Sequence, residues 1–264
     1  MLAIIALVVS QLSGVDITGL LGGAGGSGRA GGAPSGTETS LQCTAGQANA
    51  DDACRIQGAA ASLDTYWAGA LQGYVPPQPT VVFEQATETG CGSATSDAGP
   101  FYCPADRTIY LDTAFYARMR AQFGATIGPL AQLYIIGHEW GHHIQNITGT
   151  MRGKELRGSG AASDSVRLEL QADCYAGAWI GAAATTRDAQ GRTFLQPVTQ
   201  RQLADALDAA AAVGDDHIEK TVRGSVNPEG FTHGTSAQRQ RWFEAGRQGG
   251  PGSCDTFSVP PSAL

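Results

Sequence analysis

The stretch His138-Glu139-Trp140-Gly141-His142 decides how this sequence is interpreted. Two histidines four residues apart project from one face of a helix, about one turn from each other, which lets both imidazoles reach a single tetrahedral ion. Glu139 follows the first histidine directly. In such a site this carboxylate lies beside the open coordination position, where it can take a proton from water. The motif therefore predicts a zinc-binding helix with Glu139 as a general base.

The residues around the motif predict a buried helix from Pro129 to Ile147. Two buried imidazoles beside a carboxylate need partners, which a metal would supply. The alternative is that His138 and His142 are ordinary packed or exposed helix residues. Gly137 and Gly141 lower the helix propensity, and this cost makes sense if another backbone or a substrate approaches closely.

A catalytic zinc ion takes three protein ligands and leaves one position open, so a further ligand is expected after the motif. The extended metzincin pattern is absent, because Gln145 and Thr148 stand where it requires Gly and His. Glu155 lies in a Gly-flanked loop, whereas Glu169 lies inside a helix predicted over Asp164 to Ala183. The predicted metal ligands are therefore His138, His142 and Glu169, with one Zn²⁺ per chain.

Asp173 stands four residues after Glu169 and hence on the same helical face. We expect it to accept the second N–H of a zinc-bound imidazole and so fix the tautomer of that ring. The alternative is a solvent-facing Glu and Asp pair, but the flanking residues are largely apolar. Cys174 is turned about 140° away from Glu169 and is expected in a disulfide or the core.

His233 lies in a Gly-flanked segment before a helix predicted over Ala237 to Arg247. A loop at this place could present the imidazole to the cleft and stabilise an oxyanion, so His233 is a second catalytic candidate beside Glu139. The alternative is a histidine packed at a helix entry. Tyr110 is a weaker candidate for the same role. His143 points about 100° off the metal face and is expected to be structural.

Six cysteines allow 15 pairings, and no Cys-x-x-Cys pair is present. Local spacing and elimination favour three bridges: Cys43 with Cys54, Cys91 with Cys103, and Cys174 with Cys254. Disulfides would indicate an oxidising compartment, and buried free thiols are the alternative.

Composition predicts one folded catalytic domain. The chain has 264 residues, of which 42% are hydrophobic and 16% charged, so it is long enough for a sizeable core. Its net charge is -7 and no run of Lys or Arg occurs, so the basic surface of a nucleic-acid-binding protein is missing. We therefore expect no nucleic-acid partner.

The N-terminal part predicts three regions. Residues 1–18 are an apolar segment, interpreted as part of a membrane anchor or as signal-like, although the run is shorter than the roughly 20 apolar residues of a comfortable span. Residues 19–40 form a flexible Gly-rich linker, and residues 41–264 form the zinc-binding domain. We expect a membrane-anchored or secreted protein with an extracytoplasmic catalytic domain. The alternative is a cytosolic protein with an apolar tail.

Residue patterns beyond the motif indicate an α+β fold, rich in helices and with a small sheet. Strands are predicted over Thr80 to Glu84 and Thr108 to Asp112, because both runs are β-branched or aromatic and are bounded by turn residues. Further helices are predicted over Thr113 to Phe123 and Arg201 to Ala212, and Thr235-x-x-Gln238 matches a capping box for the last helix.

Several segments together resemble the bacterial neutral zinc metallopeptidases. They are Cys91 to Ala94, Gly99 to Asp106, Ile109 to Asp112, Gly137 to Gln145, Arg167 to Gly177 and Phe231 to Arg239. The resemblance covers most of the chain after the linker. It implies a zincin-like fold, a Glu-liganded zinc site of the gluzincin kind, and an N-terminal anchor followed by a Gly-rich linker. One departure is that no charged segment precedes the apolar run.

Motif and resemblance together predict a zinc metallopeptidase that hydrolyses peptide bonds through a zinc-activated water, with peptides or proteins as substrates. An extended substrate is expected to pair with an edge strand at Thr108 to Asp112. Two alternatives stay open: a catalytically silent zinc-binding extracytoplasmic interaction module, and a zinc hydrolase of non-peptide amides. The sequence leaves the substrate and the oligomeric state unspecified.

Overall fold

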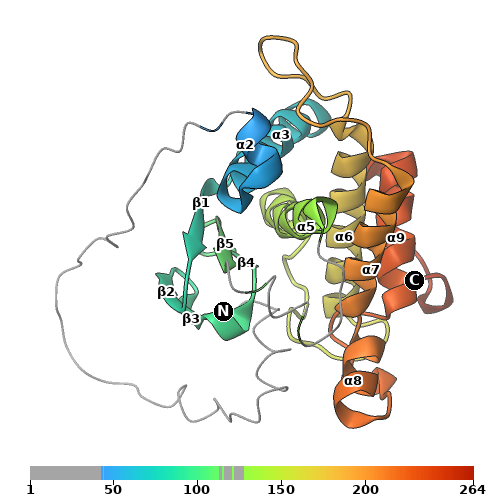
Figure 1. Ribbon diagram of the computed structural model, residues 1–264. Coiled ribbons are helices and arrows are strands. Elements are labelled where there is room, and N and C mark those ends of the chain that lie inside the picture. Colours follow the sequence, from blue (N-terminus) through green and yellow to red (C-terminus); the bar gives the residue numbers. More distant parts are fainter. Residues whose placement is uncertain (1–42, 44, 113–114, 116–120, 122–127) are drawn as a thin grey trace.

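Helices are the most abundant secondary structure among the described residues of the computed structural model, and a small sheet lies on one side of them (Figure 1). The structure describes residues 43, 45–112, 115, 121 and 128–264. The helices are α2 (Ala45–Ala50), α3 (Asp52–Ala70), α5 (Pro129–Thr148), α6 (Asp164–Ala183), α7 (Gln200–Ala212), α8 (Asp215–Arg223) and α9 (Ser236–Gly249). This architecture confirms the predicted helix-rich α+β class.

The central element is α5, which lies between the sheet and the helices α6, α7 and α9 (Figure 1). Pro129 occupies its first turn, where a missing N–H costs nothing. Gly149 ends it in the left-handed region at φ 79°, a conformation that glycine adopts without a steric penalty. Residues Leu130 to Gln145 are all buried, so the predicted motif helix is confirmed as a core helix.

The helices α6 and α9 pack backbone against backbone. A Cβ atom on Gly177 would lie 2.0 Å from the carbonyl oxygen of Phe243, and one on Gly246 would lie 1.8 Å from that of Cys174. Any side chain at either glycine would force these helices apart. The close approach fixes α9 against α6, and the Phe243 ring of α9 also packs against Tyr134 of α5.

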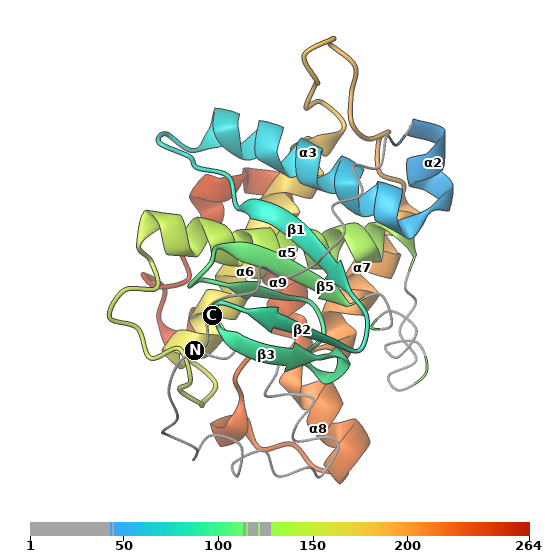
Figure 2. The same cartoon turned by 90° about the vertical axis from the view of Figure 1, so that its left-hand side faces the viewer.

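The main sheet has the strand order β1 (Gln78–Phe83), β5 (Thr108–Asp112) and β4 (Phe101–Cys103). Strand β5 pairs in parallel with β1 and antiparallel with β4. The sheet lies over α5, and α3 runs alongside β1 (Figure 2). The expectation of a free edge at Thr108 to Asp112 is wrong, because this strand is hydrogen-bonded on both sides.

Other predicted elements agree with the structure to within a few residues. Strand β1 begins two residues before the expected Thr80, and α6 has the predicted bounds. The capping box at Thr235 and Gln238 is present at the start of α9. The helix predicted over Thr113 to Phe123 lies largely outside the described residues. Sequence patterns missed α2, α3, α8 and the hairpin of β2 (Ala86–Thr89) and β3 (Gly92–Thr95).

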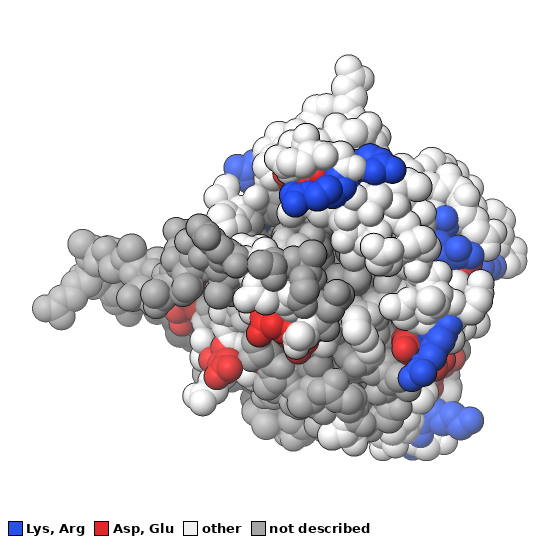
Figure 3. All heavy atoms as spheres, turned by 45° about the horizontal axis from the view of Figure 1, so that its top comes forward, with Lys and Arg blue, Asp and Glu red and all other residues white. Residues whose placement is uncertain are grey.

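The predicted apolar segment and Gly-rich linker, residues 1–18 and 19–40, lie outside the described residues. Within the described part of the chain, no helix is both long and apolar enough to cross a membrane. On the face drawn in Figure 3, Lys and Arg side chains of the described residues occur in small separate groups, and so do Asp and Glu side chains.

Candidate metal centre

The two histidines of the motif meet on one face of α5. Their Nε2 atoms lie 3.1 Å apart, and both rings are buried. This face of α5 can approach α6 closely because Gly141 has no side chain. A Cβ atom there would lie 2.8 Å from the Cα atom of Ala172. The predicted reason for this glycine, the close approach of another backbone, is therefore correct.

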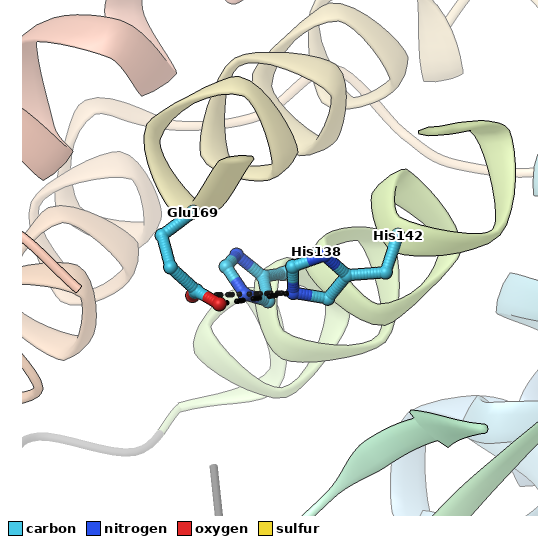
Figure 4. A group of neighbouring side chains, drawn as sticks. All are labelled: His138, His142 and Glu169. Atoms are coloured by element: carbon cyan, nitrogen blue, oxygen red, sulfur yellow. Dashed lines mark hydrogen bonds and ion pairs between the residues drawn. The ribbon is translucent and has the colours of Figure 1, made fainter. Parts of the chain in front are cut away.

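Close packing of the two helices brings Glu169 of α6 to the histidines of α5 (Figure 4). One carboxylate oxygen of Glu169 lies 3.1 Å from His138 Nε2, and the other lies 3.4 Å from His142 Nε2. The potential ligand atoms of the three residues all lie within 4.8 Å of one another. Two imidazole nitrogens and one carboxylate oxygen are a donor set that suits zinc.

Unsatisfied buried atoms are concentrated around this cluster. Among the described residues, seven buried side-chain N or O atoms lack a hydrogen-bond partner, and five of them belong to Glu139, Glu169 and His233. Glu169 lies close to His138 and His142, but neither of its oxygens makes a hydrogen bond of normal geometry. Burying unpartnered carboxylate oxygens is costly, and a bound cation would remove that cost. The residues present therefore fit a metal ion.

Asp173 contacts His138 on Nδ1, the ring nitrogen that faces away from the cluster. Its Oδ1 atom lies 2.8 Å from His138 Nδ1, and it also accepts a hydrogen bond of 2.5 Å from the Tyr134 hydroxyl. Arg239 of α9 donates from Nε to Oδ2 of the same carboxylate at 2.8 Å. The expected contact between Asp173 and an imidazole of the motif is present. A carboxylate only accepts here, so His138 Nδ1 carries the proton and Nε2 faces the cluster.

The electrostatics of the cluster favour positive charge at His138. Burial disfavours the charged ring, but Asp173 and Glu169 outweigh it and raise the pKa of His138 to about 10. Burial raises the pKa of Glu169, yet the neighbouring histidines outweigh it and hold this pKa well below the usual range. The carboxylate of Glu169 is buried against both imidazoles, and its negative charge would also attract a metal cation.

Glu139 is buried beside the cluster, and neither of its oxygens makes a hydrogen bond of normal geometry. Burial raises the pKa of its carboxyl to about 8, against the opposing effect of His138. Burial has the opposite effect on the neighbouring His142, because it lowers the pKa of that ring to about 4. A buried carboxyl with a raised pKa and no ionic partner among the described residues is a candidate functional group.

His233 lies on a short segment held by Asp215, the first residue of α8. One oxygen of Asp215 accepts the backbone N–H groups of Thr232, His233 and Gly234 at 2.8, 2.7 and 2.9 Å. The other oxygen lies 3.3 Å from His233 Nδ1. His233 Nε2 is buried without a partner, and His233 contributes to the low pKa of Glu169. The structure thus places His233 near the cluster with one ring nitrogen uncommitted.

Three residues weighed in the sequence have other roles. The Tyr110 hydroxyl donates to Asp106 at 2.8 Å, so it is not directed at the cluster. The two ring nitrogens of His143 lie 3.0 Å from the Tyr102 hydroxyl and 2.7 Å from the carbonyl oxygen of Val75, which is the expected structural role. Cys174 is in a disulfide.

All three favoured disulfides are present, and the described residues contain no free cysteine. The bridges are Cys43–Cys54, Cys91–Cys103 and Cys174–Cys254. Such bridges persist in oxidising compartments, so they indicate an extracytoplasmic environment for the domain.

Sequence reasoning missed three residues that support the cluster: Tyr134, Gln145 and Arg239. Tyr134 and Arg239 both contact Asp173, and Gln145 contacts His142 with its Oε1 atom 3.0 Å from Nδ1. A signal existed for Gln145, because it stands three residues after His142 on the same helical face. No local signal relates Arg239 to Asp173 across 66 residues.

The sequence model of the family described as "Putative neutral zinc metallopeptidase" matches residues 1–257. The chain belongs to this family. It is 46% identical over 221 residues to "Uncharacterized protein Rv2575" of Mycobacterium tuberculosis (strain H37Rv), an alignment that covers 83% of this chain and 75% of that protein. It is 36% identical over 269 residues to "Uncharacterized protein YpfJ" of Escherichia coli (strain K12), and this alignment covers 97% of this chain and 86% of that protein. No solved structure matches the chain.

Proposed function

We propose that this chain is a zinc-dependent metallopeptidase that hydrolyses peptide bonds of peptides or proteins. The observation that carries the proposal is the buried His138, His142 and Glu169 cluster with the unpartnered carboxylate of Glu139 beside it. A structural zinc site would be closed by four protein ligands, whereas the described residues supply three at this place.

A zinc ion held by these three side chains would supply a Lewis acid that polarises a carbonyl and makes a nearby water more acidic. Glu139 accepts the proton of the attacking water and then delivers it to the leaving amine. Glu139 suits both steps because it is buried beside the cluster without an ionic partner, in the described part of the chain, that would fix its protonation state.

His233 is the proposed partner for the oxygen that gains negative charge during attack. Asp215 Oδ1 lies 3.3 Å from His233 Nδ1, and a carboxylate only accepts, so this nitrogen carries a proton. The uncommitted Nε2 atom acts as the donor in the charged ring, in which both nitrogens carry a proton. The backbone hydrogen bonds to Asp215 hold the loop in place, so the donor needs no reorganisation.

An extended substrate is expected along β4 rather than β5. Strand β4 is an outer strand of the sheet and contacts α5. The backbone N–H of Tyr102 on this strand contributes to lowering the pKa of Glu139, so the strand passes close to the carboxylate. Pairing with its outer edge would lay a peptide across the site.

The proposal also includes a location outside the cytoplasm. The three disulfides support an extracytoplasmic domain of residues 41–264, which residues 19–40 would tether to an N-terminal segment that anchors the protein in a membrane or directs its secretion. Nucleic acid is not among the proposed partners.

The experiment that tests the function is metal analysis of the purified protein together with a peptide-substrate library, assayed with and without a chelator. Stoichiometric zinc and chelator-sensitive cleavage are expected. Bound zinc without cleavage of any peptide would favour a silent zinc-binding interaction module. Cleavage of non-peptide amides alone would favour the other alternative, an amide hydrolase.

A further inference from the structure

The second metal-binding imidazole, His142, is held by an amide rather than by a carboxylate. Gln145 is fully buried on α5, and its Oε1 atom lies 3.0 Å from His142 Nδ1. A carboxylate can only accept, so Asp173 sets the tautomer of His138 by its chemistry alone. A side-chain amide carries both donors and acceptors, so its effect on His142 depends on which way it is turned.

The orientation of the Gln145 amide follows from its other contacts. Its Nε2 atom lies 2.7 Å from the carbonyl oxygen of Leu168, the residue before Glu169. A backbone carbonyl only accepts, so the NH₂ group must face Leu168 and the amide oxygen must face His142. His142 Nδ1 is then the donor. The lone pair of the neutral ring is left on Nε2, the atom that lies 3.4 Å from Glu169.

The Gln145 amide is itself contacted by a second side-chain amide, that of Gln171, which is also oriented by a backbone carbonyl. Gln171 on α6 donates from Nε2 to the carbonyl oxygen of Cys254 at 3.0 Å. This contact turns the Oε1 atom of Gln171 toward Gln145, whose Nε2 atom lies 3.2 Å away. Cys254 is itself fixed by its disulfide to Cys174. Backbone carbonyls thus determine the orientation of both amides, and neither can turn over without losing hydrogen bonds to them.

We propose that Gln145 is a positioning residue that keeps the proton of His142 on Nδ1 and presents Nε2 to the metal, and that Gln171 and the Cys254 carbonyl hold Gln145 in the required orientation. The inference rests on the proposed metal site and adds to it the residues that prepare its second imidazole. Metal retention is thereby coupled to the segment around Cys254, which lies more than 100 residues after the motif.

The tautomer can be measured on the wild-type protein. In ¹⁵N-labelled protein at neutral pH, the His142 ring is expected to show a protonated Nδ1 in both the metal-free and the zinc-loaded form, with zinc bound at Nε2. A proton on Nε2 of the metal-free ring, or zinc at Nδ1, would overturn the assignment. This measurement does not depend on whether any variant folds.

Variants test the role of the amide in metal binding. Zinc dissociation constants would be obtained by competition with a chromophoric chelator for Gln145→Leu and for Gln145→Glu, which keeps an acceptor for His142. The matched control is Gln132→Leu, because Gln132 is also a buried glutamine of α5 but accepts its hydrogen bond from Arg55. Loss of a supporting group typically weakens metal binding about 10- to 100-fold.

The expected order of zinc affinity is wild type, then Gln145→Glu, then Gln145→Leu, with Gln132→Leu equal to the wild type. Gln171→Leu should weaken binding by a smaller factor than Gln145→Leu, because the Leu168 carbonyl still holds the Gln145 amide. Unchanged affinity in Gln145→Leu, or an equal loss in Gln132→Leu, would overturn the positioning role. Unchanged zinc affinity in Gln171→Leu would overturn the proposal that Gln171 holds Gln145 in its orientation.

These results are distinguishable from a failure of the proposed function. A wild-type protein that binds no zinc would refute the zinc peptidase, whereas the tautomer in the metal-free protein would still decide the role of Gln145. A protein that binds zinc but cleaves no peptide would refute the peptidase activity and leave the affinity series intact.

Discussion

Arg239 of α9 and Asp173 of α6 form an ion pair in which Nε lies 2.8 Å from Oδ2 and Nη2 lies 3.0 Å from Oδ1. Both side chains are buried, and the same carboxylate contacts Nδ1 of His138. The two-point geometry fixes the plane of the carboxylate as well as its position. The orientation of the His138 imidazole, a candidate metal ligand on α5, therefore depends on a cation contributed by α9.

Replacing this cation should destabilise the fold. Arg239→Met leaves Asp173 buried without its compensating charge, which typically costs about 3–5 kcal/mol in the free energy of unfolding. Arg241→Met is the matched control, since Arg241 is an exposed residue of the same helix and should change stability by at most about 0.5 kcal/mol. Denaturant unfolding of the metal-free proteins measures both, and equal stabilities would contradict the assigned role of Arg239.

The metal content should depend on the three clustered residues. His138→Ala or Glu169→Ala removes one of only three protein ligands, so each variant should lose zinc after dialysis against a weak chelator. His217→Ala and Glu155→Ala are the matched controls, because neither residue belongs to the cluster. Atomic absorption gives the zinc per chain. A ligand assignment is wrong if its variant keeps one tightly bound zinc ion.

Glu139→Gln should separate metal binding from turnover. The amide keeps the shape of the side chain but removes its basicity, so zinc content should survive and peptide hydrolysis should fall at least about 100-fold, equivalent to about 3 kcal/mol in the barrier. Rates and zinc content would be measured on the same preparations. Loss of zinc together with activity would make Glu139 a ligand or a structural group instead.

The three disulfides should contribute unequally to stability. Cys174–Cys254 spans 80 residues, whereas the other two bridges span 11 and 12. In the chain-entropy account, the long bridge should contribute about 4.5 kcal/mol and each short one about 3 kcal/mol. Paired Cys→Ala variants, unfolded by denaturant, measure the difference. Peptide mapping without reductant checks the pairing, and six alkylated thiols would refute both the bridges and the extracytoplasmic placement.

A methyl group between α6 and α9 should be poorly tolerated. Gly177→Ala places a Cβ atom 2.0 Å from the Phe243 carbonyl oxygen, so the helices must separate at a cost of at least about 1–3 kcal/mol. Gly69→Ala is the control, because Gly69 is exposed on α3 and nothing lies within 4 Å of the added atom. That change should stabilise the fold by up to about 1 kcal/mol. Thermal unfolding distinguishes the two substitutions.

The parts of the site that sequence predicted are those with a local signal. The spacing of His138 and His142 follows from the helical period, and Glu169 and Asp173 share a face of the next predicted helix. The capping box at Thr235 was predictable for the same reason, since it involves only neighbouring residues. These features depend on the chain within one helix and needed no knowledge of how the helices pack.

The parts that sequence missed depend on contacts between distant segments. Strand order decides that Thr108 to Asp112 is a central strand, and nothing within that run specifies its neighbours. Helix α3 is hard to predict because its run from Gly58 to Ala61 consists of small residues on every side, which hides the helical period. Arg239 falls on the same face of α9 as Trp242, Phe243 and Gly246, but nothing in the sequence indicates that Asp173 is its partner.

The placement of Arg239 and Cys254 has a consequence for biosynthesis. A nascent chain that has emerged from the ribosome or translocon only as far as α7 already contains α5 and α6, the two helices of the candidate metal site. It lacks the guanidinium that holds Asp173 and the carbonyl that holds Gln171. Until those residues emerge, the imidazoles of α5 have incomplete support. The hydrogen bonds that hold the imidazoles of the candidate metal site are therefore complete only after the chain beyond α9 has left the tunnel.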